Sequence, residues 1–106
     1  MIRSDSAEAR PPLTLESLKA LIKVSFESRS VIFKPHARYQ TKERKISFQD
    51  VKHVCMNARF EKAPRYEHEK QNWKYELKGE DLDEVETTIV IAVDNDERVV
   101  TIITCF

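Results

Sequence analysis

The sequence contains one glycine, two cysteines and no long apolar run. A single glycine cannot build the glycine-rich loop that cradles a nucleotide phosphate. The longest apolar run, residues 89–93, is far shorter than the roughly 20 residues that cross a bilayer. The first twelve residues lack the apolar core of a secretory signal. These absences favour a cytoplasmic protein that does not enter a membrane.

The two cysteines, Cys55 and Cys105, are too few and too far apart for a disulfide framework or a zinc site. Both lie among apolar neighbours, so we expect them to be small buried side chains. His68 stands between two glutamates, but no ordered spacing of ligands supports a metal there, and an exposed loop is expected. The sequence therefore predicts neither a metal nor another cofactor.

The chain of 106 residues has room for one domain, which we place at residues 13–106 after a flexible lead-in at residues 1–12. Hydrophobic periodicity and capping residues predict three helices and four strands. The helices are expected at residues 14–27, at residues 35–44 and from residue 47, and the strands at residues 31–33, 72–78, 88–93 and 99–105. Gly79 is expected to end one strand, and residues 94–97 to form a turn.

This order of elements predicts the α+β class. Two or three N-terminal helices would pack on a mostly antiparallel sheet of three to four strands.

The net charge of zero conceals two oppositely charged segments. Residues 29–78 hold thirteen basic and six acidic residues, whereas residues 79–106 hold eight acidic residues and one basic residue. A basic segment of this kind favours a polyanionic partner. The alternative is that folding interleaves the two segments, so that their fields cancel.

The predicted helix at residues 35–44 is the densest polar cluster in the chain. His36, Gln40 and Arg44 would share one of its faces, because residues four apart are neighbours on a helix. An imidazole suits a general base, and the cations Arg44, Arg38 and Lys42 suit a phosphate and its transition state. These groups are what metal-independent RNA cleavage requires. A solvated polar helix without activity is the alternative.

The aromatic residues beside the lysines of residues 72–78 admit two interpretations. Trp73 and Tyr75 could stack on bases next to Lys74 and Lys78, as aromatic side chains do on RNA-binding sheets. Packing in the core is the alternative, since Trp73 and Tyr75 alternate with polar residues.

Short motifs distributed over residues 31–106 resemble the domain-of-unknown-function family DUF4258. The resemblance rests on His36-Ala37, Arg44, Ile46-Ser47, Val51, the strand around Tyr75 to Gly79, and Ile103-Thr104. It implies the compact fold of RelE-like and barnase-like ribonucleases. Family members usually place an arginine where this chain has Gln40.

The resemblance also implies a function: the toxin of a toxin–antitoxin pair. It would act on RNA, with ribosome-associated mRNA as one candidate target, and its protein partner would be a YgiT-type zinc-finger antitoxin. His36, Arg44 and Arg38 would be catalytic residues, and Lys42, Tyr39, Tyr75 and Thr104 would contact RNA phosphates or bases. The main alternative is a module of the same fold that binds protein or RNA without catalysis. A small-molecule or metal-dependent enzyme, suggested only by His68 and the acidic loop, is the third.

Overall fold

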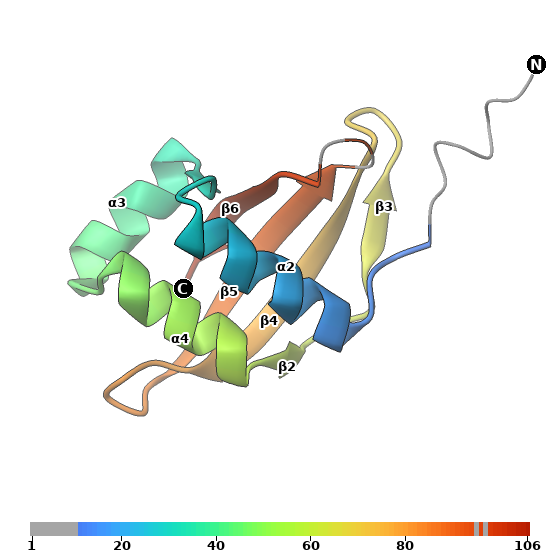
Figure 1. The fold of residues 1–106 in the computed structure, drawn as a ribbon. Helices are drawn as coiled ribbons and strands as arrows, with labels where there is room; N and C mark the ends of the chain where they lie inside the picture. The colour runs from blue at the N-terminus through green and yellow to red at the C-terminus, as the bar shows by residue number, and fades with distance from the viewer. Residues whose placement is uncertain (1–10, 95, 97) are drawn as a thin grey trace, which may run out of the picture.

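The computed structural model describes residues 11–94, 96 and 98–106. It has the predicted α+β class, with helices on a mostly antiparallel sheet (Figure 1). The helices are α2 (Leu15–Glu27), α3 (Pro35–Arg44) and α4 (Phe48–Asn57). The strands are β1 (Ile32–Phe33), β2 (Arg59–Phe60), β3 (Arg65–Glu67), β4 (Asn72–Glu80), β5 (Glu86–Asp94) and β6 (Val100–Cys105).

The helix boundaries follow from local chemistry, as the sequence predicted. The Thr14 side chain accepts a hydrogen bond from the Ser17 amide and begins α2. Ser47 and Asp50 form a reciprocal capping box at the start of α4. Pro35 occupies the first turn of α3, where its missing N–H leaves no hydrogen bond unmade.

Six strands form one sheet in the order β1-β6-β5-β4-β2, with β3 also paired to β4. All pairs are antiparallel except β1 with β6. The prediction of three to four strands was too low, because no strand was expected at the positions of β2 and β3. These strands have two and three residues, which is too short for an alternating pattern to be recognised.

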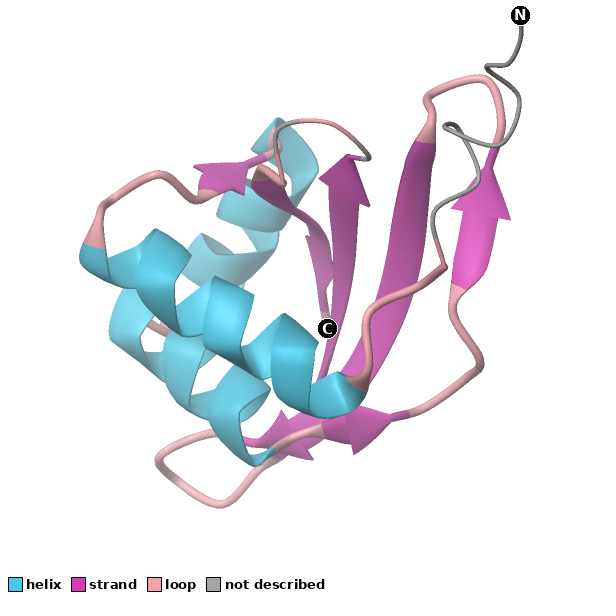
Figure 2. Cartoon of the chain, turned by 45° about the vertical axis from the view of Figure 1, so that its right-hand side comes forward, coloured by secondary structure: helices cyan, strands magenta, loops and turns pink. Residues whose placement is uncertain are grey.

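Helices α2 and α4 lie across one face of the sheet, and α3 lies beside β6 (Figure 1). Leu18 and Ile22 of α2 and Val51 and Val54 of α4 are fully buried in the core between the layers. The opposite face of the sheet carries none of the described helices, and we call it the open face (Figure 2). No described helix is both long and apolar enough to cross a membrane.

Gly79 corrects one sequence prediction, because it lies inside β4 and does not end it. A Cβ atom at this position would stand 2.5 Å from the Val54 carbonyl oxygen and 2.7 Å from Asn57 Oδ1. The glycine therefore allows the end of α4 to approach β4 more closely than any side chain would permit.

Two further expectations fall largely outside the described residues. The flexible lead-in at residues 1–12 overlaps the description only at Pro11 and Pro12, which belong to no helix or strand. The predicted turn at residues 94–97 includes two positions that the structure does not describe.

Candidate functional site

Helix α3 is held against the sheet by its buried residues and by its ends. Ala37 and Thr41 are the residues that it buries. At its C-terminus, Lys45 adopts a left-handed conformation with φ of 56°, and its amide donates to the carbonyls of Lys42 and Thr41. The Lys34 amide donates to the Ile102 carbonyl and ties the start of α3 to β6.

Two polar side chains of α3 connect it to the C-terminal strands. Gln40 Oε1 accepts a hydrogen bond of 2.7 Å from the Cys105 amide in β6. Arg44 Nη2 donates a hydrogen bond of 3.2 Å to Thr87 Oγ1, a hydroxyl on the buried side of β5. Sequence reasoning missed both contacts and assigned Arg44 to catalysis. The structure places Arg44 at the junction of α3 with the sheet, bonded to Thr87.

The remaining polar side chains of α3 point to solvent. His36, Arg38 and Lys42 are exposed, and Tyr39 retains 62% of its accessible surface. Arg38 Nε donates a hydrogen bond of 3.2 Å to the Phe33 carbonyl, which anchors the guanidinium group at this nitrogen. Within residues 11–94, 96 and 98–106, no ion pair involves His36, Arg38 or Lys42. Helix α3 therefore presents the cations Arg38 and Lys42 and an aromatic ring outside any ion pair of the described residues, beside the exposed carboxylate of Glu43.

His36 and Arg44 do not meet at one point. They stand at opposite ends of α3, about 12 Å apart along its axis at 1.5 Å per residue. Arg44 is half-buried against β5, whereas His36 is exposed in the first turn. Of the three residues on the predicted face, Gln40 and Arg44 are bonded to the strands, and His36 is the one that is fully exposed.

Tyr75 and Thr104, the two predicted RNA contacts outside α3, are less exposed than His36, Arg38 and Lys42. Tyr75 is 1% exposed, and its hydroxyl accepts a hydrogen bond from the Leu13 amide at 2.9 Å. Burial raises the pKa of this phenol. The prediction that Tyr75 contacts RNA conflicts with its place in the core. Thr104 is half-buried on β6, opposite Val90 of β5.

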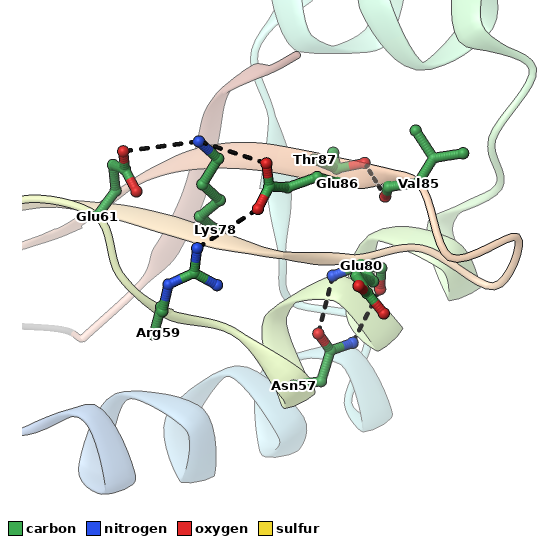
Figure 3. A network of polar contacts seen from close by, with 8 residues as sticks. All are labelled: Asn57, Arg59, Glu61, Lys78, Glu80, Val85, Glu86 and Thr87. Atoms are coloured by element: carbon green, nitrogen blue, oxygen red, sulfur yellow. Dashed lines mark hydrogen bonds and ion pairs between the residues drawn. The ribbon is translucent and has the colours of Figure 1, made fainter.

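Ion pairs neutralise part of the basic segment along β2, β3 and β4. Figure 3 shows those of Arg59 and Lys78. Glu86 of the acidic C-terminal segment pairs with Arg59 at 3.4 Å and with Lys78 at 3.6 Å. Lys78 also pairs with Glu61, and Lys74 pairs with Glu67. Folding therefore brings an acidic residue of segment 79–106 against basic residues of segment 29–78, as the alternative interpretation of the charge pattern required. None of these ion pairs involves α3.

The cysteines are buried, as the sequence predicted. Burial raises the pKa of Cys55 to about 12 and also raises that of Cys105, so both thiols stay protonated at neutral pH. His68 is exposed, with its ring against Tyr66. Among the described residues, no three His, Cys, Asp or Glu side chains are grouped so that they could hold a metal.

Comparison with known proteins gives one match. A family model described as domain of unknown function (DUF4258) matches residues 33–106, which include α3, α4 and the whole sheet apart from Ile32. No curated protein and no solved structure gives a significant match. Because the family model covers more than half of the chain, the protein belongs to the DUF4258 family.

Proposed function

We propose that this domain acts on RNA and that α3 is the element that contacts it. The observation that carries the proposal is a helix that is fixed to the sheet and still exposes three polar side chains. Gln40 and Arg44 hold α3 on the sheet. Arg38 and Lys42, one turn apart, and His36, at the exposed end of the face that it shares with Gln40 and Arg44, belong to no ion pair among the described residues. The exposed pair of cations Arg38 and Lys42 suits a phosphate backbone, because phosphate contacts dominate protein affinity for nucleic acids.

The proposed reaction is metal-independent cleavage of the RNA chain. His36 accepts the proton of a ribose 2′-hydroxyl, and the 2′-oxygen forms a bond to the adjacent phosphorus. The P–O5′ bond breaks, and the departing 5′-oxygen takes a proton from water. Arg38 and Lys42 stabilise the negative charge on the phosphorus centre. The products are a 2′,3′-cyclic phosphate and a 5′-hydroxyl.

The biological role that we propose is the toxin of a toxin–antitoxin pair in the cytoplasm, with a zinc-finger antitoxin as partner. It is supported by membership of the DUF4258 family together with the resemblance described above. A toxin of this kind arrests growth by removing RNA, which makes the role directly measurable.

The second candidate is an RNA-binding module without catalysis. It is favoured by the separation of His36 from Arg44, because Arg44 is already engaged with Thr87. Such a module binds RNA with the salt dependence of counterion release but gives no turnover.

Induced expression in bacteria tests the proposal. We expect the wild type to arrest growth and deplete cellular RNA, and His36→Ala to do neither. His53→Ala, which removes another exposed histidine from α4, is the matched control and should behave as the wild type. Growth arrest and RNA loss that persist in His36→Ala would contradict the catalytic role. Normal growth with intact RNA in all three would leave the binding module.

A further inference from the structure

The open face of the sheet contains a hollow of about 200 Å³ with several lysines at its rim. We call it the lysine pocket. Its walls include Lys34, Lys70, Lys74, Asn72, Ala92 and Thr101. None of the residues proposed for catalysis on α3 lines it.

The register of the sheet explains why a hollow forms here. Lys74, Ala92 and Thr101 are direct partners across β4, β5 and β6 and therefore lie in one row. The side chain of Ala92 is a single methyl group, so the centre of the row is lower than its ends. Thr101 also pairs with Ile32 of β1, and Lys34 follows Ile32 by two residues on the same side of the chain.

Positive charge in the lysine pocket is only partly neutralised. Lys74 pairs with Glu67 at 2.6 Å, and its side chain is 17% exposed. Lys34 and the turn residue Lys70 are exposed, and neither belongs to an ion pair within the described part of the chain. Two acids lie on this face beside Asn72, because Glu67 of β3 and Asp94 of β5 are both its register partners; the Asp94 carboxylate accepts from the Val99 amide.

The pocket also contains a polar group without a partner. Asn72 Oδ1 is buried and makes no hydrogen bond to the described residues. Unsatisfied buried polar atoms are rare in native proteins and call for an explanation. A ligand with hydrogen-bonding groups beside its negative charge would let the Asn72 amide turn and satisfy both of its polar atoms.

We propose that the lysine pocket is a phosphate subsite for an RNA strand, an assignment that rests on the function proposed above for α3. Lys34 and Lys70 bind a backbone phosphate, and Asn72 and Thr101 bond to the sugar or base beside it. Lys34 lies two residues before His36, at the junction of β1 with α3. A strand that fills the pocket therefore continues past this junction to the exposed side of α3.

Binding of a labelled single-stranded 2′-O-methyl RNA, which cannot be cleaved through the 2′-oxygen, tests the pocket separately from catalysis. Fluorescence anisotropy would be measured over a range of salt for the wild type and for the double variant Lys34→Ala/Lys70→Ala. We expect the double variant to bind at least about tenfold more weakly. The slope of log affinity against log salt should fall by about two, one for each lost phosphate contact.

Lys23→Ala/Lys52→Ala is the matched control, because it removes the same charge from the helical layer. Equal weakening in both double variants would overturn the subsite, even if the wild type cleaves RNA. A selective loss in the pocket variant would support it, even if the wild type proves inactive as a nuclease. Displacement of the RNA by inorganic phosphate at equal concentration would show a general anion site and overturn the RNA assignment.

Discussion

The side-chain oxygen of Gln40 lies 2.7 Å from the backbone nitrogen of Cys105, a residue 65 positions later in the sequence. Strand β1 has only two residues and pairs with β6 as far as Ile102. Beyond Ile102, the side chain of Gln40 accepts a hydrogen bond from the Cys105 amide, which no strand accepts at this edge of β6. The contact fixes α3, and with it the exposed residues around His36, relative to the sheet.

Replacing Gln40 by alanine should destabilise the fold. The variant leaves the amide of the buried Cys105 without an acceptor, which costs about 1–3 kcal/mol. Urea denaturation measures the free energy of unfolding. Gln40→Glu keeps an acceptor oxygen and should lose less than Gln40→Ala. If both variants unfold at the same urea concentration as the wild type, the contact contributes nothing.

Arg44 should behave as a positioning residue of α3. Removal of its guanidinium in Arg44→Ala takes the donor from Thr87 Oγ1, and a loss of about 1–3 kcal/mol is expected for a hydrogen bond from a charged group. Lys42→Ala removes an equal charge from the exposed side of α3 and should change the free energy of unfolding by less than about 0.5 kcal/mol. Thermal unfolding of both variants measures the difference. Equal stability of Arg44→Ala and Lys42→Ala would contradict the positioning role of Arg44.

Gly79→Ala should loosen the contact between α4 and β4. The added methyl group meets the backbone at Val54 and the amide of Asn57, and overpacking of this kind costs about 1–3 kcal/mol. Glu76→Ala, at a half-buried position on the open face of the same strand, is the control and should cost less. A Gly79→Ala protein as stable as the wild type would mean that α4 can move away at no cost.

The buried thiols predict a loss of stability at alkaline pH. Burial raises the pKa of folded Cys55 to about 12, whereas a thiol in the unfolded chain has a pKa of about 8.5. The folded state therefore keeps a proton that the unfolded state has released. The stability that comes from this retained proton is complete below the pKa of the unfolded thiol. It is lost as pH rises towards the pKa of the folded thiol, by at most about 1.4 kcal/mol per pH unit for Cys55.

Urea denaturation of the wild type and Cys55→Ala at about pH 8 and about pH 10 checks this prediction. We expect the substitution to lower stability at both pH values, because Cys55 is fully buried, but the variant lacks the titrating thiol. Its free energy of unfolding should fall less between the two pH values than that of the wild type. Parallel losses in the two proteins would show that Cys55 ionises as readily in the folded chain as in the unfolded one.

The elements with strong local signals could be predicted from the sequence. The caps at Thr14 and Ser47 and the periodicity of α2 and β4 depend on residues close together in the chain. Gly79 was misassigned because the usual association of glycine with turns takes no account of a helix packed on the strand. The reason for this glycine is a contact with Val54 and Asn57, which only the folded chain reveals.

The candidate site was predictable only in part. The polar composition of α3 identified an exposed basic helix, and His36, Arg38 and Lys42 occupy it. The contacts of Gln40 and Arg44 join residues 65 and 43 positions apart, and no local pattern reports such distances. Lys34 and Lys70 come together only because β1, β4, β5 and β6 align in one sheet, so the sequence did not single them out.

Cleavage of end-labelled single-stranded RNA by the purified domain in the presence of EDTA tests the catalytic role of His36 most directly. We expect the wild type and His53→Ala to produce fragments with 2′,3′-cyclic phosphate ends. His36→Ala should reduce the rate at least about 100-fold while keeping the wild-type thermal unfolding. Equal rates for the wild type and His36→Ala, or no cleavage by the wild type, would contradict the catalytic role assigned to α3.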